Sequence, residues 1–143
     1  MTATRNAVSY RPSRGKGGTQ AALEDYVEVI NHLIKKYGYA SQTDVAERLG
    51  VSKPSVTLML QRLKDKGYVE YVKYRGIGLT QKGRRLAERM EERHKMLAEF
   101  FLLIGVDEHI AYEDAELIEH YLHPITLQKI SELLDKLKKK NLK

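Results

Sequence analysis

The chain has 143 residues, of which 42% are hydrophobic and 31% are charged, and it contains no cysteine. This composition predicts a folded globular protein and excludes collagen-like chains, mostly disordered chains, a disulfide framework and a thiolate metal site. No apolar run approaches the roughly 20 residues that span a bilayer, and the amino-terminal residues lack the apolar core of a secretory signal peptide. The expected location is therefore the cytoplasm.

The net charge of +6 is unevenly distributed along the chain. Residues 38–85 contain ten basic and four acidic residues, whereas residues 86–134 contain four basic and eleven acidic residues. This asymmetry predicts one surface that meets a polyanion and another that meets cations, with ordinary solvated faces as the alternative. Residues 1–19 carry four basic residues, no acidic residue and few apolar ones, which predicts a disordered basic arm.

Apolar periodicity predicts three helices in the first half of the chain, over residues 20–37, 42–49 and 53–66. Ser41 and Ser52 precede the second and third helices and are typical N-cap residues. A glycine follows each of the three helices, which is typical of helix C-termini. The first half is therefore predicted to be a compact three-helix unit.

After the third helix the sequence pattern changes from the helical spacing of apolar residues to one typical of β-strands. Residues 69–73 and 77–80 are β-prone and flank a short turn, so they predict a small hairpin. A long helix over residues 81–104 follows, then one that starts at Asp107 and a last one that opens at Pro124. The expected fold class is mainly α, with an N-terminal winged helix-turn-helix and a β-hairpin wing before an all-helical domain.

The order helix, short helix, turn, helix and hairpin is that of a winged helix-turn-helix, whose third helix lies in the major groove of DNA. Small polar residues at the start of that helix let the backbone approach DNA closely, and basic residues further along and on the hairpin would meet phosphates. The alternative is a helical bundle with an incidental hairpin. The candidate DNA-binding residues are Ser52, Lys53, Pro54, Ser55, Thr57, Arg62, Lys73 and Arg75.

Acidic and histidine side chains recur at helical spacing beside apolar positions. Two carboxylates lie three residues apart in the first helix, and a Glu-x-x-Glu-His motif follows the i, i+3, i+4 pattern near residue 120. Because carboxylates at the border of an apolar face need a cation, these side chains predict a divalent-metal site. The candidate ligands are Asp25, Glu28, His94, Glu116, Glu119 and His120.

Two other classes of protein are considered. A carboxylate-bridged di-metal oxidase also uses Glu and His on bundled helices, but it needs a Glu-x-x-His pair on each of two helices, which this chain does not have. A winged-helix regulator of an organic ligand would need an apolar pocket and would ignore metal. Chelation of metal in a DNA-binding assay would separate this second class from a metal sensor.

Six motifs together resemble the diphtheria toxin repressor family, and in particular its manganese transport regulator branch. The similarity covers about residues 21–138 and implies a winged-helix DNA-binding domain over residues 20–80 and a helical metal-binding and dimerisation domain over residues 81–143. The dimer contact is then expected in the C-terminal helices, where residues 100–103 offer apolar side chains. The six motifs are EDYVEVI, VSKPSVT, KYRGIGLTQKG, RHKMLAEFF, LIGVD and DAELIEHYL.

In that branch an Asp and a Glu of the first helix, a His of the long helix and the Glu-x-x-Glu-His motif bind a pair of manganese ions. The resemblance therefore implies that all six candidates are ligands and that each subunit binds two Mn²⁺ ions. Iron-responsive relatives place Met and Cys among their ligands, where this chain has Asp25 and Glu116. Hard oxygen donors favour Mn²⁺, although the Irving–Williams order would still give Zn²⁺ and Cu²⁺ the higher raw affinity.

The predicted function is that of a Mn²⁺-responsive transcriptional repressor of manganese uptake genes, and not that of an enzyme. The expected partners are a double-stranded DNA operator and a second copy of the chain, since two half-sites suit a dimer. No membrane and no organic cofactor are expected. The alternatives are an iron-responsive repressor of the same family and a winged-helix regulator that senses an organic ligand.

Overall fold

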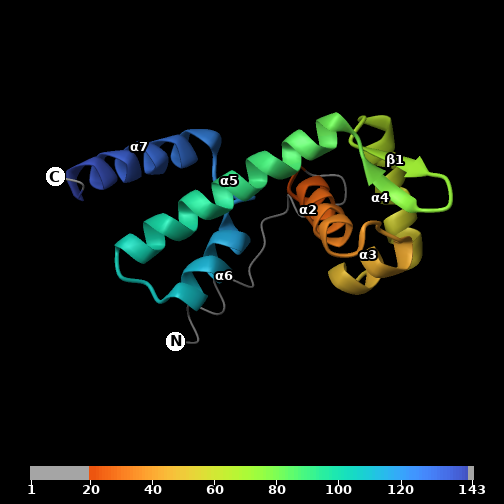
Figure 1. The fold of residues 1–143 in the computed structure, drawn as a ribbon, viewed down its shortest axis with the longest axis horizontal. Coiled ribbons are helices and arrows are strands. Elements are labelled where there is room, and N and C mark those ends of the chain that lie inside the picture. Colours follow the sequence, from red (N-terminus) through yellow and green to blue (C-terminus); the bar gives the residue numbers. More distant parts are fainter. Residues whose placement is uncertain (1–19, 142–143) are drawn as a thin grey trace. The chain divides into compact units, whose positions relative to one another are not determined.

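The computed structural model describes residues 20–141, in which six helices and a two-stranded antiparallel sheet follow one another (Figure 1). This arrangement confirms the predicted fold class. The predicted basic arm, residues 1–19, lies outside the described residues. The described residues divide into two compact units, the first ending at Gly83 and the second beginning at Arg84. Within the described part of the chain, no helix is long and apolar enough to cross a membrane.

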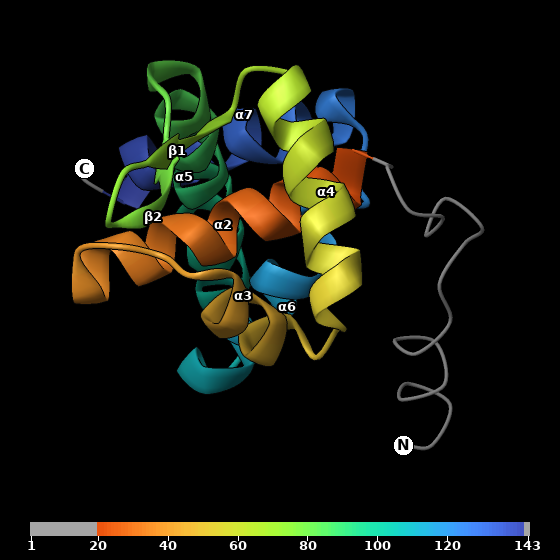
Figure 2. The same ribbon diagram turned by 90° about the vertical axis from the view of Figure 1, so that its right-hand side faces the viewer.

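The first unit is built on three helices, α2 (Gln20–Tyr37), α3 (Gln42–Leu49) and α4 (Lys53–Asp65). Helix α2 contacts α3, α4 and the wing, and α3 contacts α4 (Figure 2). The apolar periodicity of the sequence explains this packing, because the buried apolar side chains of each helix recur at three- and four-residue spacing. The largest buried side chains of this unit are Leu23, Val27, Ile30, Val45, Val56, Leu60 and Leu63.

The helix-turn-helix is set by local capping. Ser41 Oγ accepts a hydrogen bond from the backbone N–H of Asp44 at 3.1 Å, and Ser52 Oγ accepts one from Ser55 at 3.2 Å. Gly50 ends α3 with φ of 67°, a left-handed conformation that glycine adopts without a steric penalty. These two N-caps and one glycine explain why the predicted bounds of α3 and α4 agree with the structure to within one residue.

The wing consists of β1 (Val69–Val72) and β2 (Gly76–Leu79), which pair antiparallel. The backbone N–H of Ile77 donates to the carbonyl oxygen of Ala40 at 2.8 Å, so the hairpin is tied to the residues that precede α3. Gly76, the first residue of β2, has φ of +105°, and an added Cβ would lie 2.5 Å from the same carbonyl oxygen. The wing is therefore held by a glycine and this backbone contact, in addition to the packing of β2 on α2 and of β1 on α4.

Helix α5 (Gln81–Leu103) begins in the first unit and is anchored there by its first turn. The Thr80 hydroxyl donates to the carbonyl oxygen of Gly67 at 2.6 Å and accepts from the backbone N–H of Gly83 at 3.1 Å. Lys82 Nζ donates to the carbonyl oxygen of Lys66 at 2.7 Å. The start of α5 is thus fixed to the connection between α4 and the wing.

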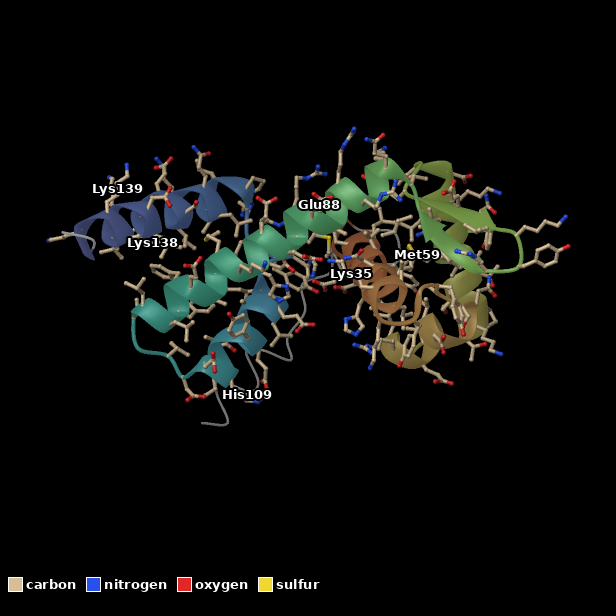
Figure 3. The ribbon with its side chains drawn as sticks, viewed as in Figure 1. Lys35, Met59, Glu88, His109, Lys138 and Lys139 are labelled. Carbon is tan, nitrogen blue, oxygen red and sulfur yellow. The ribbon has the colours of Figure 1, made fainter. Side chains whose placement is uncertain are left out.

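The second unit consists of the rest of α5 together with α6 (Glu108–Ile118) and α7 (Pro124–Asn141). Lys138 in the last turns of α7 forms an ion pair with Glu99 of α5 at 2.9 Å, and its side chain is labelled in Figure 3. The core of this unit is formed by Leu97, Ala98, Ala115 and Leu127, against which Met96, Phe101, Ile118, Leu122 and Ile130 pack.

One expectation for α6 is wrong. The Glu-x-x-Glu-His motif was expected on one helix face, but α6 ends at Ile118, and Glu119 is its C-cap. His120 lies in the turn that follows. Pro124 opens α7 and disfavours helical backbone at His123, so α6 cannot run on into α7 and a turn joins the two helices. Glu119 keeps helical backbone angles and its N–H donates to the carbonyl oxygen of Ala115 at 3.2 Å, whereas His120 is positioned by the turn.

Candidate metal and DNA-binding sites

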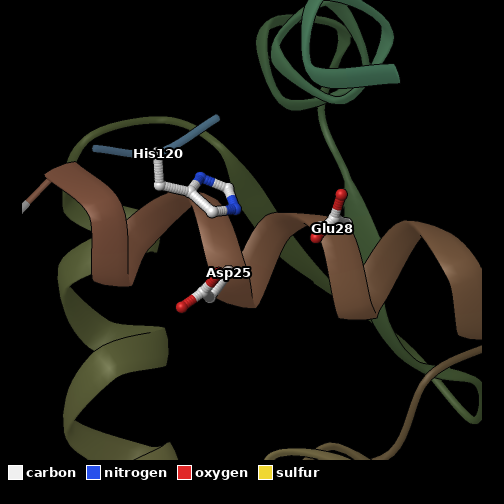
Figure 4. Close-up of side chains that lie close together, drawn as sticks. All are labelled: Asp25, Glu28 and His120. Atoms are coloured by element: carbon white, nitrogen blue, oxygen red, sulfur yellow. The ribbon is translucent and has the colours of Figure 1, made fainter. Parts of the chain in front are cut away.

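Two carboxylates of the first unit project from α2, one turn apart (Figure 4). The side chains of Asp25 and Glu28 are half-buried, whereas their neighbours Tyr26 and Val27 belong to the apolar core. Burial raises the pKa of the Tyr26 hydroxyl above its usual range, as expected for a group among apolar side chains. Helix α2 therefore presents its acids at the border of its apolar face, as the spacing predicts.

A third acid of α2 escaped the sequence analysis. Glu24 is only 6% exposed, and its Oε2 accepts a hydrogen bond from Gln20 Nε2 at 3.1 Å. A signal for its burial was present in the sequence, because Glu24 lies three residues before Val27 and so on the apolar side of the helix. The start of α2 thus holds three acidic residues within two turns, and Glu24 lies beside the predicted ligands Asp25 and Glu28.

In the second unit, three nitrogen-bearing side chains surround the fully buried carboxylate of Glu119. Its Oε1 lies 3.4 Å from His94 Nδ1 and 3.6 Å from His120 Nε2. Its Oε2 lies 3.6 Å from Arg93 Nε. Three of the six predicted ligands, from α5 and from the turn after α6, are therefore brought together within this unit. Arg93 joins them without having been predicted.

The chemistry of this cluster fits a divalent metal ion. The three separations exceed the roughly 2.7–2.9 Å of a charge-assisted hydrogen bond. Neighbouring ligands of a six-coordinate ion with bonds of about 2.2 Å lie about 3.1 Å apart, which is close to the spacing of the two histidine nitrogens from Oε1. One carboxylate and two imidazoles form a donor set that transition metals such as Mn²⁺, Fe²⁺ and Zn²⁺ accept.

The remaining predicted ligand of this unit, Glu116, is exposed on α6, and its role as a ligand stays a prediction. His109, which the sequence analysis did not place among the ligands, is exposed at the start of α6 (Figure 3). Its Nε2 lies 2.8 Å from Glu113 Oε2 one turn further along the helix. This exposed pair is solvated and contributes little to stability.

The candidate DNA surface lies on α4 and on the wing, and the side chains that carry it are exposed. Some of its hydroxyl groups are already engaged within α4. Thr57 Oγ1 donates to the carbonyl oxygen of Lys53 at 3.1 Å, so it can offer only lone pairs to a DNA base. Ser55 Oγ accepts from Ser52 Oγ at 2.9 Å and keeps its proton to donate. The exposed predicted residues are Ser52, Lys53, Pro54, Ser55, Thr57, Arg62, Lys73 and Arg75.

Two exposed apolar side chains of this surface were missed by the sequence analysis. Leu58 on α4 is 68% exposed, although Met59 beside it is buried. Tyr74 at the tip of the wing is 94% exposed, with φ of 66°, and Lys73 Nζ lies 5.2 Å from the centre of its ring. Leu58 could have been found from the sequence, because it falls outside the i, i+3, i+4 stripe of α4.

Family models match almost the whole described chain. The N-terminal DNA binding domain of the iron dependent repressors matches residues 19–77, and the metal binding and dimerisation domain of the same family matches residues 80–141. The HTH-type transcriptional regulator MntR of Bacillus subtilis (strain 168) is 43% identical over 130 residues, which cover 87% of this chain and 92% of that protein. The regulator of the same name from Lysinibacillus sphaericus (strain C3-41) is 45% identical over 113 residues, 79% of this chain and 81% of that protein.

Solved structures of metal-dependent regulators share the fold. The manganese regulator SloR is 27% identical with a TM-score of 0.65, and the match covers 79% of this chain and 53% of SloR. The apo form of the manganese-activated repressor ScaR is 25% identical with a TM-score of 0.69, over 78% of this chain and 53% of ScaR. The chain therefore spans about half the length of these solved proteins.

The two family models and the curated relatives agree with the geometry. A winged helix with an exposed basic surface precedes a helical unit that holds a buried carboxylate among histidines. The resemblance predicted from sequence motifs is confirmed. The chain belongs to the iron dependent repressor family and is a DNA-binding transcriptional regulator with a metal-binding and dimerisation domain.

Proposed function

We propose that this protein is a Mn²⁺-responsive repressor that binds its operator as a homodimer and represses manganese uptake genes when metal is bound. The observation that carries the proposal is the buried Glu119 carboxylate among two histidines, in a chain whose structural relatives include a manganese regulator. In this proposal residues 20–80 bind DNA, residues 81–143 bind metal and dimerise, and the protein acts in the cytoplasm.

The proposed ligands are the six residues predicted from the sequence, and the proposed stoichiometry is two Mn²⁺ ions per subunit. Four of the six are carboxylates, whose charges the two ions would balance, so the empty ligand set repels itself. Bound metal supplies the positive charge that lets these carboxylates approach one another. Because α2 contributes two of them and also belongs to the DNA-binding unit, metal binding and DNA binding are coupled in this proposal. The proposed ligands are Asp25, Glu28, His94, Glu116, Glu119 and His120.

The choice of Mn²⁺ over Fe²⁺ rests on the donor types. Asp25 and Glu116 supply hard anionic oxygen at positions where the iron-responsive branch is expected to place softer sulfur ligands. Among first-row metals Mn²⁺ has the lowest affinity for a given site, so oxygen donors and geometry must provide the selectivity. An iron-responsive repressor with the same fold is the alternative, and a comparison of the two metals at equal free concentration decides between them.

The proposed dimer surface lies on the second unit. Of the four residues expected at the contact, Phe101 packs into the core and Phe100 is half-buried, whereas Leu102 and Leu103 stay 37% and 41% exposed. A second copy of the chain is the proposed occupant, because the family's dimerisation domain matches this part of the chain. Further exposed apolar side chains of the unit are Ile104, Ile110, Tyr112, Leu117, Ile125 and Leu133.

Mn²⁺ is expected to strengthen operator binding by about 5–150-fold, the usual range of coupling between two sites on one protein. The operator is first selected from random duplex DNA by the Mn²⁺-loaded protein. Fluorescence anisotropy then compares the affinity for that DNA with Mn²⁺, with Fe²⁺ and with excess chelator. Equal affinity in Mn²⁺ and in chelator would contradict the sensor function and leave only a DNA-binding protein.

We further expect Leu58 to read thymine methyl groups, because an exposed leucine in the major groove has no polar atom to pair with a base edge. Leu58→Ala is expected to weaken operator binding about tenfold, and replacing the operator thymines by uracil should weaken the wild-type protein similarly. The variant should not distinguish the two DNAs.

Arg75→Ala provides the matched control for Leu58. Its guanidinium is exposed on the wing and is proposed to meet phosphate, so this variant should weaken operator and random DNA alike. For this variant the slope of log affinity against log salt concentration should become shallower by about one. If the wild-type protein binds uracil and thymine operators equally well, then Leu58 is not a reader of methyl groups.

A further inference from the structure

Arg93 places a permanent positive charge against the buried carboxylate of Glu119. Its Nε lies 3.6 Å from Glu119 Oε2, and the two side chains are 29% and 0% exposed. A guanidinium keeps its proton at every pH at which proteins fold, unlike the histidines. A carboxylate removed from water must be compensated by a cation, since its desolvation is otherwise prohibitive. Arg93 therefore supplies charge that the cluster needs in the absence of metal.

Two histidines approach the opposite oxygen of this carboxylate. His94 Nδ1 and His120 Nε2 both approach Oε1, whereas the Arg93 guanidinium approaches Oε2. Arg93 and His94 are consecutive on α5, so their side chains leave the helix about 100° apart and reach the carboxylate from two sides. A metal ion that took Glu119 as a ligand together with the two histidines would thus be close to the guanidinium.

We infer that the Arg93 guanidinium stabilises the Glu119 carboxylate in the metal-free protein and opposes metal binding. It thereby sets the metal concentration at which the regulator responds. The inference rests on the proposed function, because it presupposes that Glu119 is a metal ligand. Repulsion between a guanidinium and a divalent ion a few ångströms apart lowers metal affinity below what the donor set alone would give. A sensor benefits from this reduction, since it must release metal when the metal becomes scarce.

The test is Mn²⁺ titration by calorimetry of the full chain without DNA. Arg93→Gln is expected to bind Mn²⁺ about tenfold more tightly than the wild-type protein, whereas Arg93→Lys, which keeps the charge, should stay within about twofold. Arg89→Gln is the matched control, because Arg89 is exposed one turn earlier on α5 and its loss changes the net charge equally. This control should also stay within about twofold of the wild-type protein.

Thermal unfolding supplies a second measurement. Without metal, Arg93→Gln should melt at a lower temperature than the wild-type protein, because Glu119 loses its cation. Added Mn²⁺ should raise the melting temperature of the variant more than that of the wild-type protein, since stabilisation grows with the ratio of free metal to Kd. This comparison remains valid even if the metal-free variant is only partly folded.

Two outcomes would overturn the inference while leaving the proposed function intact. Unchanged Mn²⁺ affinity in Arg93→Gln would show that the guanidinium does not compete with metal. Weaker Mn²⁺ binding would show that Arg93 instead orients Glu119 for the ion. A wild-type chain that binds no Mn²⁺ at all would contradict the proposed function itself, so the two failures are distinguishable.

Discussion

Gly76→Ala is expected to lower the free energy of unfolding by about 4 kcal/mol, through backbone strain and steric overlap together. The φ angle of +105° disfavours any residue with a Cβ, and the added methyl group would lie 2.5 Å from the carbonyl oxygen of Ala40. That oxygen cannot retreat freely, since it accepts the hydrogen bond from Ile77 that ties the wing to the helix-turn-helix. Urea denaturation followed by circular dichroism measures the loss.

Two matched glycine variants separate the two causes. Gly38 has φ of +87° but no atom within 4 Å of an added Cβ. Gly38→Ala should therefore lower the free energy of unfolding by about 1 kcal/mol, through backbone strain alone. Gly83→Ala should cost about 3 kcal/mol without positive-φ strain, because its Cβ would overlap the carbonyl oxygen of Tyr68. If Gly76→Ala were no more destabilising than Gly38→Ala, the contact between the wing and Ala40 would not constrain the fold.

Glu119→Gln is expected to weaken Mn²⁺ binding by at least about 100-fold. The change keeps the size of the side chain but removes the charge that lies between His94, His120 and Arg93. Loss of a group that only hydrogen-bonds to a ligand lowers metal affinity by about 10–100-fold, so loss of a carboxylate that binds the metal directly should lower it more. Calorimetric titration of the purified full chain with Mn²⁺ measures the effect.

Glu113→Gln is the control for this prediction, because Glu113 is an acid of α6 that is exposed and pairs with His109. Its Mn²⁺ affinity should match that of the wild-type protein. Circular dichroism of both variants checks that the helices are retained. Wild-type affinity in Glu119→Gln would remove the central ligand of the proposed metal site, even if operator binding still depended on Mn²⁺.

The elements of this fold were predictable because their signals are local. A serine N-cap, a glycine after the last turn and a proline in the first turn each act within about four residues. Helices α2 to α5 and both strands of the hairpin begin and end within one residue of the prediction, and α6 and α7 begin within one residue of it. Candidate ligands could be named from the sequence for a similar reason, since three-residue spacings place Asp25 with Glu28 and Glu116 with Glu119 on one helix face. Their role as metal ligands stays a prediction.

Contacts between distant parts of the chain were decided by the tertiary structure alone. The contact between Arg93 and Glu119 depends on how α5 packs against α6. No spacing along the sequence predicts that contact. The sequence likewise could not show that α6 stops at Ile118, because its periodicity continues past the point where the chain must turn toward Pro124. Amino-acid types and local spacing determined the kind of metal site that this protein can form. Packing determined that the permanent positive charge of Arg93 lies beside Glu119, because the two residues are 26 positions apart in the sequence.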